Sequence, residues 1–174
     1  RDMLKATGFA AAGLALSPWI NFARANDSQA RKKVLFFTKS AGFQHSVITR
    51  SSDNPDKLAY AEQILTDLGA KNGFDVVCSK DGSIFTPDNL QQFDLIAFYT
   101  TGDLTKDSSN PTFEKSAGGK VVANKKVMTK EPGMGDAGKT AFLDAIKNGK
   151  GFIGFHCATD TFHSPAHVRG QVNL

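Results

Sequence analysis

The sequence has few cysteines, a small net charge and no long apolar run. Each of these features excludes some classes of protein. Its 174 residues include two cysteines, Cys78 and Cys157, which stand at the ends of different predicted strands and need not lie within bridging distance. The main apolar stretch, residues 6–20, is too short and too weakly apolar for a convincing membrane span. The length suits one domain with a sizeable core.

The charge is nearly balanced once the N-terminus is set aside. Without residues 1–25, Lys+Arg falls from 21 to 18 and Asp+Glu from 17 to 16, so the net charge falls from +4 to +2. The basic residues are scattered apart from clusters at 31–33 and 125–126, which are typical of solvated surface. We therefore expect no nucleic-acid partner.

Residues 1–25 have the pattern of an export signal. A charged start precedes the apolar stretch, and Ala23-Arg24-Ala25 is a small-x-small cleavage site, which predicts a mature domain of residues 26–174. Residues 1–5 also resemble the end of a twin-arginine motif whose preceding Arg is missing. These features predict recognition by bacterial export machinery and a periplasmic or secreted location. An uncleaved N-terminal anchor is the alternative.

The mature part alternates apolar runs with segments of helical spacing. This alternation is typical of an α/β fold, here an open, flavodoxin-like parallel sheet with helices on both faces. The apolar run at the start of residues 151–163 is typical of a central strand buried on both faces. The predicted strands are residues 33–38, 74–79, 93–99 and 151–155, and the predicted helices are residues 55–68 and 139–147, with a short capped turn or helix at 86–90.

Local signals predict where the helices begin and end, and they also indicate one insertion. Residues 106–135 are rich in Lys, Ser, Gly and Asn, which predicts a long surface loop or small insertion with a short hairpin at 120–127. Caps, a proline at the first helical position and glycine stops mark the helix ends. The expected helix-end residues are Asp53 or Asn54 with Pro55, then Gly69, and Asp136.

Three predicted strands end in polar loops, where an open α/β sheet usually presents its chemistry. Because the carboxyl ends of parallel strands meet at one edge of the sheet, we expect the side chains of these loops to converge. Residues 156–163 are the richest, with imidazole, thiol, hydroxyl and carboxylate groups in one short segment. The candidates in the three loops are Lys39, Phe43, His45, Thr101, Asp103, His156, Cys157, Thr159, Asp160 and His163.

Three kinds of chemistry compete for the last loop. In the first, a histidine carries protons and Asp160 orients it. In the second, His156, Asp160 and His163, spaced i, i+4 and i+7, bind zinc or a similar divalent ion if the segment is helical. In the third, Cys157 acts as a nucleophile. We favour acid/base chemistry, place the metal site second and the thiol last. The candidate catalytic residues are His45, His156, Asp160 and His163.

Three blocks of sequence resemble the ThuA-like (trehalose-utilisation) family. They are Thr-Lys-Ser-Ala-Gly-Phe-Gln-His at 38–45, Phe-Tyr-Thr-Thr-Gly-Asp at 98–103 and Gly-Phe-Ile-Gly-Phe-His-Cys-Ala-Thr-Asp-Thr-Phe-His at 151–163. The resemblance implies a flavodoxin-like fold related to class I glutamine amidotransferases. It also implies a role in the use of trehalose and related disaccharides through 3-keto-sugar intermediates. Because members of the family continue with further strands, it implies a domain truncated at its C-terminus.

The resemblance also narrows the reaction. Residues 154–158 put His156 where the amidotransferases carry their nucleophilic cysteine, and they lack the second glycine of that turn, which argues against glutamine hydrolysis. The resemblance instead implies an enzyme that processes a small carbohydrate, a keto-disaccharide or glycoside, by acid/base or metal-assisted chemistry. The substrate-binding candidates are Lys39, Phe43, Thr101, Asp103 and Thr159.

The alternative is a sugar-binding domain of the same fold without catalysis. Three aromatic residues at strand ends, Phe43, Tyr99 and Phe162, are placed where rings can stack on a sugar. An enzyme differs in needing convergent titratable groups, which the three polar loops supply.

Overall fold

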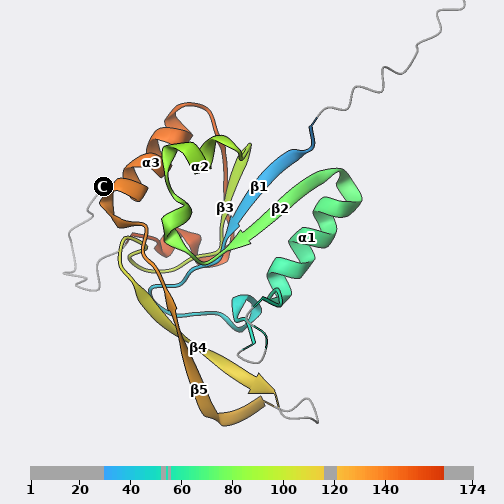
Figure 1. Ribbon diagram of the computed structural model, residues 1–174, viewed down its shortest axis with the longest axis vertical. Coiled ribbons are helices and arrows are strands. Elements are labelled where there is room, and N and C mark those ends of the chain that lie inside the picture. Colours follow the sequence, from blue (N-terminus) through green and yellow to red (C-terminus); the bar gives the residue numbers. More distant parts are fainter. Residues whose placement is uncertain (1–29, 52–53, 55, 116–120, 163–174) are drawn as a thin grey trace, which may run out of the picture. The chain divides into compact units, whose positions relative to one another are not determined.

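A parallel sheet of four strands lies at the centre of the computed structural model (Figure 1). Its spatial order is β2-β1-β3-β6, the order of a flavodoxin-like sheet, and all neighbouring pairs are parallel. The α/β fold and the strands predicted from the apolar runs are confirmed. The strands are β1 (Lys32–Phe37), β2 (Phe74–Ser79), β3 (Leu95–Phe98) and β6 (Gly151–Gly154).

The structure describes residues 30–51, 54, 56–115 and 121–162. The chain divides into Arg1–Ala30 and Arg31–Leu174, and the sheet and its helices belong to the second unit. Some of the predicted features lie outside the described residues. They are the export signal at 1–25, the helix-end residues Asp53 and Pro55, and the site role of His163.

Helix α1 (Tyr60–Asn72) covers one face of the sheet and begins later than predicted. Its first turn is capped by Glu62, whose carboxylate accepts a hydrogen bond of 2.8 Å from the backbone N–H three residues earlier. The helix ends before Gly73, which has a left-handed backbone (φ 79°). Gly69, the predicted stop, lies inside the helix, where a Cβ would approach the Phe74 carbonyl oxygen to 2.6 Å.

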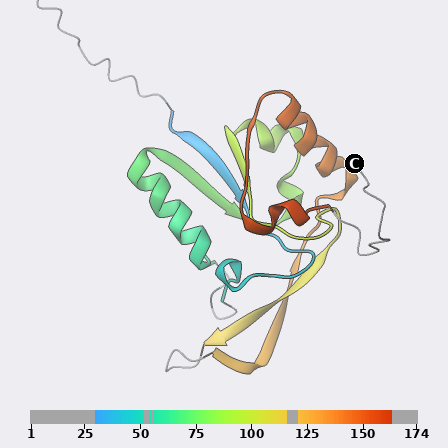
Figure 2. The same ribbon diagram turned by 180° about the vertical axis from the view of Figure 1, so that it is seen from behind.

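Helices α2 (Pro87–Gln91) and α3 (Gly135–Lys147) cover the opposite face (Figures 1 and 2). Phe142 of α3 stacks on Phe98 of β3, with ring centroids 4.8 Å apart. Asp136 lies in the first turn of α3 and is not its cap, because the helix begins one residue before it. None of the helices in the described residues has the length and apolar character needed to cross a membrane.

The main core lies between the sheet and these two helices. Its side chains alternate along β1 and β3, because successive residues of a strand point to opposite faces. Each large apolar side chain buried here stabilises the fold by about 1.5–3 kcal/mol, so this layer holds the strands in register. The buried core residues are Leu35, Phe37, Phe85, Leu90, Phe93, Ile96, Phe98, Leu104, Met134 and Phe142.

Strand β6 is less buried than predicted. It pairs with β3 alone among the described strands, so it lies at one edge of the described sheet and not in its middle. Phe152 is 45% exposed and Ile153 is 43% exposed. The prediction of a strand buried on both faces is therefore wrong for the described structure, because an apolar run does not reveal how many neighbours a strand has.

Strands β4 (Ser108–Lys115) and β5 (Val121–Glu131) form an antiparallel hairpin beyond the carboxyl ends of the parallel strands (Figure 1). The predicted long loop with a short hairpin at 120–127 is wrong in extent, since strands occupy most of residues 108–131. The base of the hairpin is attached to the sheet by Asn110, whose amide donates to the Ser40 carbonyl oxygen at 2.6 Å and to the Glu131 carboxylate at 2.9 Å.

Candidate active site

Three loops follow the carboxyl ends of β1, β3 and β6, at residues 38–45, 99–104 and 155–162, and together they are called the strand-end loops. Backbone hydrogen bonds join them beyond the strands. The Ala41 N–H donates to the Thr101 carbonyl at 2.8 Å, and the Gly102 N–H donates to the Asp160 carbonyl at 2.6 Å. The loops therefore continue the sheet order and form one scaffold.

Gly102 makes this close packing of loops possible. Its backbone is left-handed (φ 74°), and a Cβ there would lie 2.8 Å from the carbonyl carbon of Ala41 and from the nitrogen of Gly42. Beside it, the Thr101 hydroxyl donates to the Phe43 carbonyl at 2.9 Å. This contact orients the loop that carries Phe43, and the predicted role of Thr101 in substrate binding stays a prediction.

Two imidazoles meet on this scaffold. The rings of His45 and His156 have centroids 4.5 Å apart, so the expectation that both lie at one edge of the sheet is confirmed. Tyr99 lies beside both, with its ring centroid 5.9 Å from that of His45 and 5.8 Å from that of His156. The ring of Phe43 meets His45 edge-on at 4.9 Å and is 71% exposed. The imidazole pair is thus bordered by aromatic rings.

His156 is presented by a sharp turn of the backbone. It stands two residues after the end of β6, has φ 50° and begins the 3₁₀ turn η3 (His156–Asp160), the red turn in Figure 2. Histidine is among the residues that adopt this left-handed conformation more often than most, at about 1–2 kcal/mol of strain. Strain that is kept at an exposed polar side chain is a common feature of functional sites.

Cys157 brings a sulfur atom to the imidazole pair. One nitrogen from each of His45 and His156 and the sulfur of Cys157 all lie within 4.8 Å of one another. Burial raises the pKa of the Cys157 thiol, and the charge of Asp160 adds to this effect. A thiol that stays protonated is a weak nucleophile, which agrees with placing thiol catalysis last. Sequence analysis considered this cysteine only as a nucleophile and did not place its sulfur beside the imidazole pair.

The structure gathers a different set of potential metal ligands from the predicted one, of which His163 lies outside the described residues. The 3₁₀ turn has about three residues per turn, so a residue four positions after His156 does not share its side of the turn. Asp160 is exposed, and its carboxylate is not part of the group that His156 forms with His45 and Cys157. The helical spacing assumed between His156 and Asp160 is therefore wrong over η3.

The strand-end loops also fall within a family match. The family model for ThuA, described as trehalose utilisation, matches residues 33–170. The chain belongs to the ThuA family. This confirms the resemblance seen in the three sequence blocks, and it gives the ThuA chain a role in carbohydrate metabolism. No curated protein and no solved structure matches the chain significantly.

Lys39 and Asp103, two predicted substrate-binding residues of the ThuA chain, hold its scaffold together. Lys39 is fully buried and donates to the Ser108 hydroxyl at 2.5 Å and to the Glu131 carbonyl at 2.6 Å, which ties β1 to the hairpin. Burial lowers the pKa of Lys39, and the Glu131 carboxylate opposes the shift. The Asp103 carboxylate accepts from the backbone and hydroxyl of Thr105, so it closes a local turn.

Two other predicted substrate-binding residues, Phe43 and Thr159, are on the surface of the strand-end loops. Thr159 is exposed on η3, three residues after His156. Phe43 presents most of its ring to solvent next to His45. These positions leave both side chains accessible to a sugar. The buried Thr101 holds Phe43 in place, because its hydroxyl donates to the Phe43 carbonyl oxygen.

A buried ionic network under the strand-end loops of the ThuA chain was missed by sequence analysis. The Glu62 carboxylate is fully buried and accepts from the Thr38 hydroxyl at 2.6 Å and from Arg50 at 2.9 Å. Burial alone raises the pKa of Glu62, but the hydrogen bonds from Arg50 and Thr38 outweigh it and lower the pKa. Lys80 donates to the Thr38 carbonyl at 2.6 Å and lies 3.7 Å from the Glu131 carboxylate.

The local sequence points only weakly to Glu62. A capping box has Ser or Thr three residues before the glutamate, but Ala59 stands there and its side chain cannot accept a hydrogen bond, so only the glutamate half of the box is present. Nothing in the sequence indicates that the same carboxylate also accepts from Arg50, because that contact depends on how η1 (Ser46–Ile48) brings the chain back over the helix.

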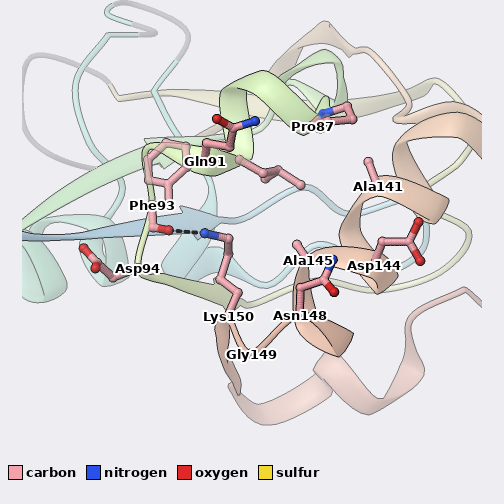
Figure 3. Close-up of a pocket in the computed structure, with 11 residues that line it drawn as sticks. Pro87, Gln91, Phe93, Asp94, Ala141, Asp144, Ala145, Asn148, Gly149 and Lys150 are labelled. Carbon is pink, nitrogen blue, oxygen red and sulfur yellow. Dashed lines mark hydrogen bonds between the residues drawn. The ribbon is translucent and has the colours of Figure 1, made fainter.

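A groove at the opposite, amino edge of the sheet carries no comparable chemistry. It has a volume of about 630 Å³ and lies between the ends of α2 and α3 (Figure 3). Lys150 points into it, but its amine donates to the Phe93 carbonyl. No histidine or cysteine is among the described residues that line it. The candidate active site of the ThuA chain is therefore the imidazole pair at the carboxyl edge.

Proposed function

We propose that this chain is an exported enzyme that processes keto-disaccharides or related glycosides by proton transfer at the His45–His156 pair. The observation that carries the proposal is the 4.5 Å separation of two imidazoles that come from loops more than a hundred residues apart in the chain. Imidazole is the side chain that enzymes use most often to accept and donate protons. Membership of the ThuA family supports a carbohydrate as the substrate.

Two neighbouring imidazoles suit a reaction that needs a base and an acid. One imidazole accepts a proton from a sugar hydroxyl, or from the carbon beside a keto group, while the other donates a proton to the oxygen on which charge develops. His156 is exposed and His45 is half-buried, so substrate reaches the pair from solvent. Asp160, at the end of η3, remains the candidate for orienting an imidazole once substrate is bound.

The aromatic border supports a sugar ring as the bound group. The side chain of Phe43 is 71% exposed, and it stands in contact with His45. Exposed aromatic surface beside convergent polar groups is typical of ligand sites. A sugar stacked on Phe43 has its hydroxyl groups within reach of the imidazoles.

The test is turnover of a 3-keto-disaccharide, with the unoxidised disaccharide run in parallel. We expect His45→Ala and His156→Ala each to lower kcat by roughly a hundredfold or more, the scale of a general acid or base. Asp144→Ala, in the groove of Figure 3, is the matched control and should keep wild-type turnover. Wild-type kcat in both histidine variants would exclude the proposal.

A sugar-binding domain without catalysis is the second candidate, and the exposed ring of Phe43 is the observation in its favour. Calorimetry separates the two. If neither oxidised nor unoxidised disaccharides are turned over, and binding weakens in Phe43→Ala but not in His156→Ala, the binding function holds and the enzymatic one fails.

Export is a separate part of the proposal. The small-x-small sequence that ends at Ala25 supports cleavage there and a mature protein in the periplasm or outside the cell. N-terminal sequencing of the protein recovered from the periplasmic fraction should begin at Asn26. Recovery in the cytoplasmic fraction alone, with residues 1–25 intact, would contradict it.

A further inference from the structure

We propose that His45, His156 and Cys157 bind one divalent transition-metal ion, with zinc the best match, and leave at least one coordination position open. The ion would be held by two imidazole nitrogens and one sulfur. The role of the ion in catalysis rests on the proposed function. Binding of the ion does not, and it can be measured without any substrate.

The donor atoms are already gathered. All three lie within 4.8 Å of one another, and this is the one such group of histidine, cysteine and acidic side chains in the described part of the chain. Zinc bonds to nitrogen are about 2.0–2.1 Å and to sulfur about 2.3 Å, so tetrahedral ligands stand about 3.4–3.6 Å apart. The most distant pair of donors would therefore move closer by about 1.2–1.4 Å at most on binding an ion.

The scaffold holds the ligands from two directions. His45 comes from the loop after β1, and the neighbouring pair His156 and Cys157 comes from the turn after β6. Both loops are hydrogen-bonded to the loop between them through Gly102 and Thr101. Because the backbone positions are set before any ion arrives, little ordering remains to oppose binding.

The ligand set selects the class of metal. A sulfur ligand and two imidazoles are typical of zinc and neighbouring transition metals, whereas magnesium and calcium prefer oxygen. Three protein ligands are also typical of catalytic zinc sites, which keep a further position for water or substrate. His156 is exposed, so that position faces the solvent from which a sugar arrives.

A bound ion changes the roles of the imidazoles. In the metal-bound protein the ion would polarise a keto or hydroxyl oxygen of the sugar and His45 and His156 would be its ligands, whereas proton transfer at the pair belongs to the metal-free protein. Phe43 and Tyr99 would border the ion with aromatic rings and limit the access of water.

The test is titration of the chelator-treated full chain with zinc alone, followed by calorimetry. We expect one ion per chain, and at least tenfold weaker binding in His45→Ala, His156→Ala and Cys157→Ser. Cys78→Ser is the matched control and should bind like wild type, since Cys78 stands on β2 and contacts Thr66 of α1. Cobalt substitution should give a thiolate charge-transfer band that Cys157→Ser loses.

A measurement on the wild-type protein guards against variants that fail to fold. Zinc should slow alkylation of Cys157 by at least tenfold while leaving Cys78 unchanged. Absence of both saturable binding and protection in the wild type would overturn the metal site.

The proposed function and the metal site fail in different ways. Loss of turnover in the histidine variants without any zinc binding by the wild type would leave the acid/base function standing and remove the metal site. Zinc binding that depends on Cys157, in a protein that turns over no sugar, would support the metal site and remove the enzymatic function.

Discussion

The two edges of the parallel sheet differ in how their polar groups are used. At the amino edge, Asp94 accepts from Lys32 at 2.8 Å and Lys150 donates to a backbone carbonyl, so the groove there is lined by locally paired groups. At the carboxyl edge, His45 and His156 face each other on loops that reach beyond the strands. The groove thus lies away from the edge that gathers imidazole and thiol groups.

This difference indicates that the direction of the strands, more than the size of a cavity, determines where the reactive side chains of this fold lie. In a parallel sheet every strand ends at the same edge, so polar residues that follow several strands meet there. The residues before the strands are short connections from helices and mainly close the helix ends. Matched substitutions at the two edges test whether they differ as much in energy as in composition.

The largest effect should come from a buried carboxylate at the carboxyl edge compared with an exposed one at the amino edge. Glu62→Ala removes the acceptor of Thr38 and Arg50 inside the fold, and we expect it to lower the free energy of unfolding by about 3–5 kcal/mol. Asp94→Ala breaks an exposed ion pair and should leave the urea midpoint close to wild type. Equal losses of unfolding free energy in the two variants would show that the two edges do not differ in energy in this way.

The next effect should come from glycines with left-handed backbones at the two edges. At Gly102 (φ 74°) an added Cβ meets the backbone of Ala41 at 2.8 Å, so we expect Gly102→Ala to cost about 2–4 kcal/mol from strain and overlap. At Gly149 (φ 92°) an added Cβ would meet no atom within 4 Å, so Gly149→Ala should cost only about 1 kcal/mol. Urea unfolding at pH 7 measures both, and similar costs would mean that the strand-end loops are not tightly joined.

A smaller effect should appear in substrate binding. Phe43→Ala removes an exposed ring beside His45, and we expect KM for the keto-disaccharide to rise roughly threefold to tenfold with kcat nearly unchanged, which corresponds to about 0.6–1.4 kcal/mol. Leu143→Ala, an exposed apolar side chain on α3, is the control and should leave KM unchanged. A fall in kcat alone would mean that Phe43 does not bind the sugar.

The smallest effect should be on acid sensitivity. The pKa of Glu62 is lowered in the folded protein, so its contribution to stability is present above the ordinary value of 4.5 and is lost as the pH falls through the folded value. We expect Glu62→Gln to flatten the dependence of the urea midpoint on pH below 4.5, while Asp94→Asn leaves it nearly as in wild type because that pair is exposed to solvent. Parallel acid profiles for wild type and Glu62→Gln would contradict this assignment.

The strands were predictable because each is a short apolar run bounded by turn residues, a signal that lies within the strand itself. Residues 33–38 and 74–79 correspond within a residue to β1 and β2. The first helix was placed less well. The start of the helix depends on Glu62, whose capping contact is made within the first turn. The extension of the helix past Gly69 depends on close packing against Phe74, which lies beyond the end of the helix.

The candidate site was predictable as a region and not as a set of contacts. The polar loops identified His45 and His156, and the parallel order of the strands brought them together. Lys39 and Asp103 looked like ligand-binding residues because they are polar and stand in these loops. In the structure the Lys39 amine is buried and donates to the hairpin, and the Asp103 carboxylate closes a local turn. Neither contact could be inferred before the hairpin and the turn were known.

By itself, the sequence determined the α/β class, the positions of four strands and the edge at which chemistry gathers, since apolar periodicity and the polar residues after each strand are properties of neighbouring residues. Only the tertiary structure decided that Cys157, and not Asp160, completes a group with the two imidazoles. The reason is geometric. The left-handed backbone at His156 and the tight 3₁₀ turn after it set which side chains face the β1 loop, and spacing along the chain does not contain that information.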